Sequence, residues 1–267
     1  MTKCAEQLTR QDKARQVRWG RHVVSAGKTS SPSKRFHATV RVNRGVRVGN
    51  EQAEFWSNVA KQYDRVVDLQ IGGNTRSMVR ERVGREGNLG RLVEFGCGTG
   101  FYTQALARKA DTVLATDISQ GMLDLAKRQV EAANVTFQAE DCQQTSLPDG
   151  AFDTAFISLV IHFTEPERTV AEMYRVLRHR GTLIIANLDP QQLNGLDRIR
   201  SLIRIVYQGV VGYRLKPPKG FGRNVRTEKQ LRELLGRSGF RVESAETIKD
   251  RSRSSNIPIE YVRAIKD

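Results

Sequence analysis

The sequence predicts an α/β fold in which helices cover both faces of a mostly parallel sheet. Short apolar segments typical of buried strands alternate with segments of helical spacing between residues 91 and 186. Such alternation favours parallel strands with helices between them. A glycine-rich turn, Gly96 to Gly100, connects the first of these strands to a helix, and an acid, Asp117, ends the second strand.

The individual elements are read from apolar and β-branched runs and from the spacing of apolar residues. Strands are expected at 91–94, 112–116, 135–138, 154–158, 182–186, 240–248 and 257–265. Helices are expected at 53–64, 75–85, 101–109, 120–132, 170–177 and 228–237, with Thr227 capping the last of them, and residues 196–207 form a further helix-like segment.

Positive charge is concentrated at the start of the chain. A chain of 267 residues with a net charge of +15 is long enough for one large domain. Residues 1–50 hold twelve Lys and Arg residues against Glu6 and Asp12, a net charge of +10, which leaves +5 for the rest. We interpret 1–50 as a basic, mostly disordered leader and 51–267 as the folded domain.

Three interpretations of the leader stay open. An organelle-targeting peptide would explain its arginines and serines. A basic arm would contact the phosphates of a nucleic acid, although a nucleic-acid partner is not favoured by a mildly basic domain. The third interpretation is a solvated tail. It includes the case in which this segment is translated from upstream of the true start codon.

Apolar runs and cysteines narrow the class of protein further. No apolar run approaches the roughly 18 residues of a membrane span, so we expect no membrane partner. The three cysteines, Cys4, Cys97 and Cys142, are too scattered for a disulfide framework or a zinc site. We therefore expect a cytoplasmic protein without a bound metal.

The glycine-rich turn is a candidate ligand site. Glycines at 96, 98 and 100 let the backbone bend tightly and approach a ligand without an intervening Cβ atom. The helix that follows offers free N–H groups at its start. A dinucleotide fingerprint would need its third glycine at position 101, where this chain has Phe101, so the spacing disfavours a nicotinamide cofactor.

Asp117 is a candidate for binding ribose. It lies 21 residues after Gly96, close to the roughly 20 residues expected for a carboxylate that accepts hydrogen bonds from ribose hydroxyls. An aspartate here could instead cap the next helix. Ser119 is better placed for that task, which leaves Asp117 available to a ligand.

The run E-F-G-C-G-T-G resembles motif I of the class I S-adenosylmethionine (SAM) methyltransferases, and the resemblance continues for about a hundred residues. Leu147 to Asp153 matches the L-P-x-x-x-F-D run of that family. A W-x-x-x-A-x-x-Y-D pattern ending at Asp64 resembles the first helix of its small-molecule members, of the type 11/25-like group. The resemblance implies a Rossmann-like seven-stranded, mostly parallel sheet with an antiparallel edge strand, and SAM as the cofactor.

The resemblance also implies roles for individual residues. Tyr63 would lie near the amino-acid end of the cofactor, Asp141 would receive the adenine amino group, and the N–H of Cys142 would meet a ring nitrogen. Ile118 and Met122 would flank the adenine, unless they serve only the core. The other cofactor-binding candidates come from the first strand, the glycine turn and the fourth strand: Glu94, Gly96, Cys97, Gly98, Gly100 and Ser158.

His162 is the candidate catalytic residue. It follows the fourth strand, where an acceptor would sit, and a histidine titrates near neutrality, which suits a general base. A packing or capping histidine explains the position equally well. The segment Ser158 to Ile161 lacks the N/D-P-P-Y/F/W motif of enzymes that methylate exocyclic amines of nucleobases.

Residues 190–225 interrupt the strand–helix pattern before the last helix. Their glycines and prolines predict an insertion, either a lid over the substrate or a surface excursion. The predicted function is SAM-dependent methylation of a small-molecule acceptor at oxygen, nitrogen or carbon. Two alternatives stay open: an RNA or protein methyltransferase guided by the leader, and a catalytically silent SAM-binding regulatory protein. The sequence does not specify the acceptor or the oligomeric state.

Overall fold

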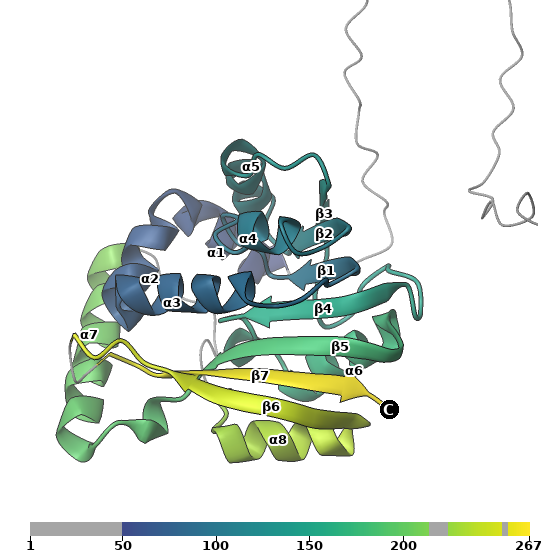
Figure 1. Cartoon of the computed structure of the whole chain (residues 1–267). Helices are drawn as coiled ribbons and strands as arrows, with labels where there is room; N and C mark the ends of the chain where they lie inside the picture. Colours follow the sequence, from purple (N-terminus) through teal and green to yellow (C-terminus); the bar gives the residue numbers. More distant parts are fainter. Residues whose placement is uncertain (1–49, 214–223, 253–255) are drawn as a thin grey trace, which may run out of the picture. The chain divides into compact units, whose positions relative to one another are not determined.

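The computed structural model describes residues 50–213, 224–252 and 256–267. The predicted leader, apart from its last residue, and positions 214–223 of the predicted lid lie outside the described residues. The described part of the chain forms one seven-stranded sheet with the order β3-β2-β1-β4-β5-β7-β6 (Figure 1).

Five strands run parallel, and β7 pairs antiparallel with both of its neighbours. The strands are β1 (Arg91–Phe95), β2 (Thr112–Asp117), β3 (Val135–Ala139), β4 (Phe152–Ser158), β5 (Leu177–Leu188), β6 (Phe240–Ile248) and β7 (Ile259–Lys266). This arrangement confirms the predicted Rossmann-like fold class.

The helices follow the strands in alternation after an N-terminal helical region. The α-helices are α1 (Asn50–Val59), α2 (Tyr63–Ile71), α3 (Gly73–Gly84), α4 (Thr103–Ala107), α5 (Gln120–Gln129), α6 (Pro166–Val176), α7 (Gly195–Tyr213) and α8 (Glu228–Arg237). Short 3-10 turns are η1 (Ala60–Gln62), η2 (Ile161–Phe163) and η3 (Pro190–Gln192). None of the described helices is both long and apolar enough to cross a membrane.

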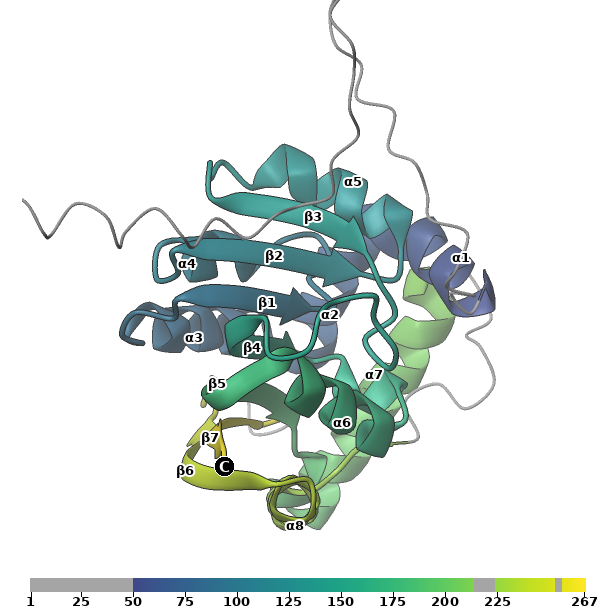
Figure 2. The ribbon, with the colours of Figure 1, turned by 90° about the vertical axis from the view of Figure 1, so that its right-hand side faces the viewer.

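Helices cover both faces of the sheet (Figures 1 and 2), and an apolar cluster lies on each face. Leu92 and Val93 are adjacent in β1 and completely buried, yet they belong to different clusters because successive strand side chains point to opposite faces. The Leu92 cluster includes residues of α3, α4 and α5, and the Val93 cluster includes residues of α6 and α8. Alternation within a strand therefore supplies both faces of the core.

Local capping signals in the sequence are confirmed. The Ser119 hydroxyl accepts a hydrogen bond from the N–H of Met122 at 3.1 Å, at the start of α5. Thr227 and Gln230 form a capping box at α8, whose bounds match the prediction. Each cap satisfies N–H groups that a helix start leaves without an internal partner.

The structure differs from the prediction at the start of β5. The sequence places a connecting turn at 178–181, between the helix expected at 170–177 and the strand expected at 182–186, but these residues lie within β5. The pairing with β4 shifts between Phe152 and Thr154, and Arg180 has a φ of 59°. An irregularity of this kind takes up extra residues without ending the strand, so the residues read as a turn form a bulge instead.

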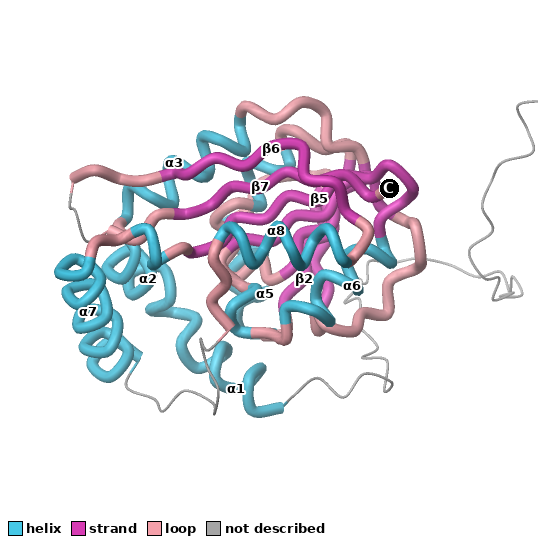
Figure 3. The backbone as a smooth tube through the Cα atoms, turned by 90° about the horizontal axis from the view of Figure 1, so that it is seen from below, coloured by secondary structure: helices cyan, strands magenta, loops and turns pink. Residues whose placement is uncertain are grey.

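Helices α1, α2 and α7 lie beyond the ends toward which the parallel strands point (Figure 2). Helix α7 packs against α2 and stands apart from the strands (Figure 3). In an open α/β sheet, ligands bind at the carboxyl ends of the strands. The N-terminal helices therefore form one wall of the expected site.

Candidate functional site

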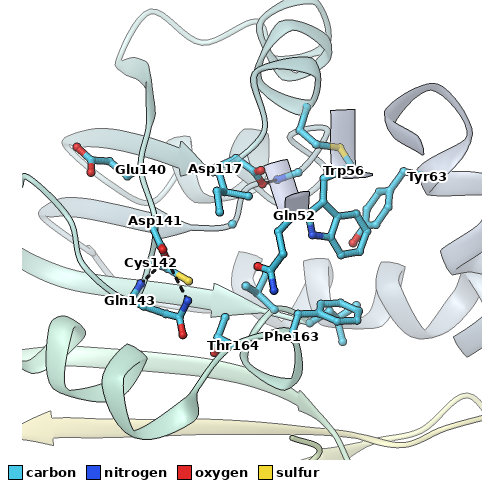
Figure 4. A pocket seen from close by; sticks show the side chains of 16 residues that line it. Gln52, Trp56, Tyr63, Asp117, Glu140, Asp141, Cys142, Gln143, Phe163 and Thr164 are labelled. Carbon is cyan, nitrogen blue, oxygen red and sulfur yellow. Dashed lines mark hydrogen bonds between the residues drawn. The ribbon is translucent and has the colours of Figure 1, made fainter. Parts of the chain in front are cut away.

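A cleft opens at the carboxyl ends of β1, β2 and β4 (Figure 4), and its volume together with the solvent space at its opening is about 600 Å³. The cleft is lined by Gln52, Trp56, Tyr63, Gly96, Gly98, Asp117, Ile118, Met122, Glu140, Asp141, Cys142, Gln143, Leu159, Val160, Phe163 and Thr164. Eight of the predicted cofactor-binding residues are among them: Tyr63, Gly96, Gly98, Asp117, Ile118, Met122, Asp141 and Cys142.

The glycines of the turn serve different purposes. Gly96 and Gly100 have φ values of 67° and 87°, where a side chain would strain the backbone. A Cβ atom on Gly96 would lie 2.4 Å from Cγ2 of Val160, and one on Gly100 would lie 2.7 Å from Cγ2 of Val130. Gly96 thus lets the loop after β4 close over the turn, and Gly100 lets α5 end beside it.

Asp117 links the glycine turn to the start of α5. Its Oδ2 accepts a hydrogen bond from the N–H of Gly98, and its Oδ1 accepts one from the N–H of Ser119, both at 2.9 Å. A carboxylate has about four acceptor sites, so these two bonds leave acceptor capacity for a ligand in the cleft. Burial raises the pKa of Asp117 to about 6, and the group is ionised at neutral pH.

The far side of the cleft is formed by the loop after β3 (Figure 4). Oδ1 of Asp141 accepts hydrogen bonds from the backbone N–H and from Nε2 of Gln143, at 2.9 and 3.3 Å. These contacts fold the loop back on itself and fix the Asp141 carboxylate at the cleft. Burial raises the pKa of the neighbouring Cys142 thiol, so its sulfur is a neutral packing group rather than a nucleophile.

Aromatic rings from α1, α2 and η2 form the opposite wall. Trp56 meets Tyr63 and Phe163 edge to face, with ring centroids 5.8 and 5.1 Å apart. Aromatic pairs in this geometry stabilise one another beyond simple burial. The wall therefore joins an N-terminal helix to the segment after β4 across the mouth of the cleft.

A charged network fixes this wall to the glycine turn. Arg76 of α3 is 3% exposed and donates to carboxylates of Asp64 at 2.7 Å and Asp68 at 3.0 Å. Its guanidinium also stacks over the Phe101 ring at 3.9 Å. Asp64 directly follows Tyr63 in α2, so the network holds the helix turn that carries Tyr63 into the cleft.

Four predicted cofactor-binding residues do not line the cleft. They are Glu94, Cys97, Gly100 and Ser158. Glu94 is completely enclosed and accepts a hydrogen bond from the Thr103 hydroxyl at 2.6 Å, and burial raises its pKa to about 8. The Cys97 N–H donates to the carbonyl of Thr116, which pins the turn to β2. These two residues support the turn from beneath, and their roles as direct contacts stay predictions.

His162 also lies outside the cleft lining. It is 5% exposed in η2, with its ring 3.9 Å from that of Phe163, centroid to centroid. Burial lowers the pKa of His162 to about 4, which makes the imidazole a weak base at neutral pH. The role of general base gains no support from this position.

The remaining cleft residues escaped sequence reasoning. They are Gln52, Trp56, Glu140, Gln143, Leu159, Val160, Phe163 and Thr164. One of them, Leu159, has an unusual backbone conformation, with a φ of 58°, and its N–H donates to the carbonyl of Ala186. Left-handed geometry costs a non-glycine residue roughly 1–2 kcal/mol, and such residues cluster at functional sites.

Within the described positions of the predicted lid, 190–213 and 224–225, no residue lines the cleft. Likewise, the described residues contain no group of three or more His, Cys, Asp and Glu side chains that could hold a metal ion.

Comparison with known proteins agrees with this arrangement. Residues 93–185 match the family described as a methyltransferase domain. The chain is 33% identical over 147 residues to malonyl-[acyl-carrier protein] O-methyltransferase of Serratia marcescens, covering 54% of this chain and 55% of the relative. It is 32% identical over 140 residues to demethylmenaquinone methyltransferase of Renibacterium salmoninarum, covering 51% and 58%.

The fold recurs among solved structures. Magnesium protoporphyrin IX methyltransferase of Synechocystis PCC 6803, with bound SAH, superposes with a TM-score of 0.58 at 19% identity, covering 81% of this chain and 98% of that one. The chain spans about half the length of the curated relatives named above.

Proposed function

We propose that the chain, whose residues 93–185 match the methyltransferase-domain family, transfers the methyl group of SAM to an oxygen, nitrogen or carbon atom of a small-molecule acceptor. One observation carries the proposal. The ionised carboxylate of Asp117, the backbone of Gly96 and Gly98, and the Asp141 carboxylate all border one cleft at the carboxyl ends of the strands.

The residues of the cleft fit this cofactor. Asp117 would accept hydrogen bonds from the ribose hydroxyls with the acceptor capacity that its backbone N–H partners leave free. Asp141 would receive the adenine amino group. Ile118 and Met122 would supply apolar surface to the adenine ring.

Gly98 and Tyr63 would hold the amino-acid end of the cofactor. A Cβ atom on Gly98 would point at the Tyr63 ring, 3.6 Å from Cε1, so the glycine widens the space in front of the ring. Gly98 has a φ of 55°, which a side chain would adopt only with strain. The turn is therefore shaped for close approach of a ligand to its backbone.

The aromatic wall would align the acceptor. When bound, the cofactor supplies a methyl group already activated by a sulfonium, so the protein mainly has to position the acceptor and exclude water. Trp56 and Phe163 can do both, because their rings close one side of the cleft. Aromatic faces also attract a cation. Gln52 and Thr164 add polar groups that can orient an acceptor atom.

The relatives support a small-molecule acceptor. By name, one acts on malonyl-[acyl-carrier protein] at oxygen and the other on demethylmenaquinone. For this chain we propose only the general class of methyl acceptor, which is a compact acyl or ring compound that enters beside Trp56 and Phe163.

The test has two steps. Titration calorimetry with SAM and with its demethylated product should show binding of each to the wild-type protein. A transfer assay with methyl-labelled SAM should then be run against carboxylic acids and thioesters, phenols and quinols, and amines. We expect labelled product from one of these classes and none from the others.

Two results would contradict the proposal. Failure to bind either compound would remove the cofactor assignment. Tight binding without transfer to any class would instead indicate a SAM-binding protein without methyltransferase activity.

A further inference from the structure

Helix α7 presents a row of large apolar side chains to solvent. Each is between 52% and 65% exposed, and the row consists of Leu196, Ile199, Leu202, Ile203, Val206 and Tyr207. At about 100° per residue, these positions fall within one arc of about 140° around the helix. A contiguous apolar surface of this kind indicates a binding surface rather than ordinary exposure.

The other side of α7 faces the protein. Asp197 and Ser201 lie there and are buried, at 5% and 1% exposed. Helix α7 also contacts α2. The helix is therefore already anchored through one side, and the apolar row is left for a partner.

Arginines border the apolar row on both edges. In helical register Arg200 lies along one edge and Arg198 along the other, and both are exposed. The only acid in the helix sequence is Asp197, which is bonded to Nδ2 of Asn194 at 2.8 Å and to Arg200 at 3.3 Å. Arg200 is thus balanced by Asp197, whereas no acid of α7 balances Arg198, so the surface combines an apolar centre with a net positive border that favours an apolar partner carrying negative charge.

We propose that the apolar row of α7 binds an anionic lipid surface, with the helix lying in the plane of the headgroups. Apolar side chains on one face and arginines beside them are the features of helices that bind at this depth. Anionic headgroups would pair with Arg198 and Arg200 while the apolar row enters the acyl boundary. Lying on a bilayer requires no membrane-spanning helix.

A second copy of the chain is a poorer partner. Two apolar rows packed face to face would bring the Arg198 and Arg200 borders together, with no exposed acid in α7 to pair with them. Like charges placed together at an interface oppose association. Charge therefore favours lipid over a symmetric contact through α7.

Lipid binding would place the cleft near the bilayer. Helices α2 and α7 lie together beyond the carboxyl ends of the strands, and α2 begins with Tyr63 of the cleft wall (Figure 1). An apolar acceptor dissolved in the bilayer would then have a short path to the cleft. This last step rests on the proposed function, whereas lipid binding itself does not.

The experiment is sedimentation of the full chain with phosphatidylcholine vesicles, with and without phosphatidylglycerol. A triple variant, Ile199→Gln with Ile203→Gln and Val206→Gln, removes apolar surface at exposed positions and should keep the fold. Met78→Gln, at an exposed apolar residue of α3, is the matched control. A second pair compares Arg198→Gln with Arg108→Gln, an exposed arginine after α4.

We expect wild-type protein and both controls to bind the phosphatidylglycerol vesicles. The triple variant should bind at least tenfold more weakly, and Arg198→Gln should bind more weakly and with a smaller salt dependence. Binding that the triple variant retains in full would overturn the proposal and assign lipid contact to another basic region. Absence of wild-type binding would also overturn it, and a loss of dimer in the triple variant would then identify the partner as a second copy. Calorimetry with SAM, run on the same samples, separates these outcomes from a failure of the proposed function.

Discussion

The Thr99 hydroxyl lies 2.8 and 3.0 Å from the two carboxylate oxygens of Asp64, and this contact joins the glycine-rich turn to helix α2. Thr99 is 2% exposed, whereas the Asp64 side chain is 36% exposed, so the bond is partly buried. Asp64 also receives Arg76. The contact therefore ties the backbone that would face the cofactor to the helix that carries Tyr63.

We predict that Asp64 and Thr99 are coupled in both stability and SAM affinity. Replacing Thr99 by Val, Asp64 by Asn, or both gives a double-mutant cycle. A hydrogen bond to a charged group is worth roughly 1.5–3 kcal/mol, so a coupling of about 1 kcal/mol or more is expected. Urea unfolding and calorimetry measure the two quantities.

The matched control is the exposed pair Gln120 and Asp124, joined at 2.8 Å within α5. Its cycle should give a coupling near zero, since exposed pairs contribute little. Equal couplings for the two pairs would show that the Asp64–Thr99 contact does not stabilise the site.

The sequence predicted what depends on local patterns. Strands, caps and the acid at the end of β2 follow from periodicity and spacing, so Asp117 and the Thr227 cap were placed correctly. The direction of Glu94 was also readable, because Glu94 alternates in step with Leu92 and so points to the same face of the sheet, toward Thr103 of α4. Glu94 was nevertheless predicted to bind the cofactor, because it lies next to the glycine turn in the sequence.

The aromatic and loop residues of the cleft could not be read in the same way. Val160 reaches the cleft because Gly96 leaves space for its side chain, and the two positions are 64 residues apart in the sequence. Gln52 and Phe163 meet the cleft only through the packing of α1 against α5 and of η2 against α6. Such contacts between distant segments have no periodic signature.

Asp117→Asn should weaken SAM binding about tenfold to a hundredfold without unfolding the protein. The estimate is a loss of roughly 1.5–3 kcal/mol for a charged hydrogen bond. Because the pKa of Asp117 is about 6 in the free protein, and ribose hydroxyls prefer the ionised form, wild-type affinity should fall by up to about tenfold per pH unit below 6. Calorimetry between pH 5 and pH 8 measures both effects, with Asp124→Asn as the control.

The variant supplies the internal comparison for the pH effect. Asp117→Asn should show a flatter affinity profile than the wild type with the same ligand. Parallel profiles, or unchanged affinity in a folded variant, would remove Asp117 from the ribose site.

Glu94→Gln should stabilise the protein progressively as the pH rises. The pKa of Glu94 is about 8 in the folded protein, against a usual value of 4.5. Between these values the folded state holds a proton that the unfolded state has lost, so this group makes stability fall as the pH rises. Glutamine keeps an oxygen that accepts the hydrogen bond from the Thr103 hydroxyl, and it does not ionise. The free energy of unfolding of the variant should therefore exceed that of the wild type by on the order of a few kcal/mol at pH 8.

Urea unfolding of both proteins from pH 5 to pH 9 measures the difference. Asp117 and His162 titrate in both proteins, so their contributions cancel in the comparison. A difference in unfolding free energy that is constant across this range would show that Glu94 is ionised throughout.

Helix α7 should become more protected from hydrogen exchange when the cleft is filled. Residues 190–225 were predicted to include a lid, and α7 contacts α2, which begins with Tyr63 of the cleft wall. A ligand that fixes Tyr63 would stabilise α2 and, through it, α7. Exchange across residues 196–213 should slow with the demethylated cofactor product, and more so with acceptor, while α8 serves as the control. Identical exchange in α7 with and without ligand would leave the segment as a static surface element.

His162→Gln should retain more than about a tenth of the transfer rate. A general base contributes 10²–10⁴-fold, but the imidazole lies outside the cleft lining and burial holds its pKa at about 4. Its packing against Phe163 gives it a supporting role in the aromatic wall. As a comparison, Phe163→Ala removes a ring that lines the cleft, and it should raise the KM for the acceptor with less effect on SAM affinity. A loss of a hundredfold or more in kcat for His162→Gln, with SAM affinity and melting temperature intact and a changed pH–rate profile, would establish His162 as the base.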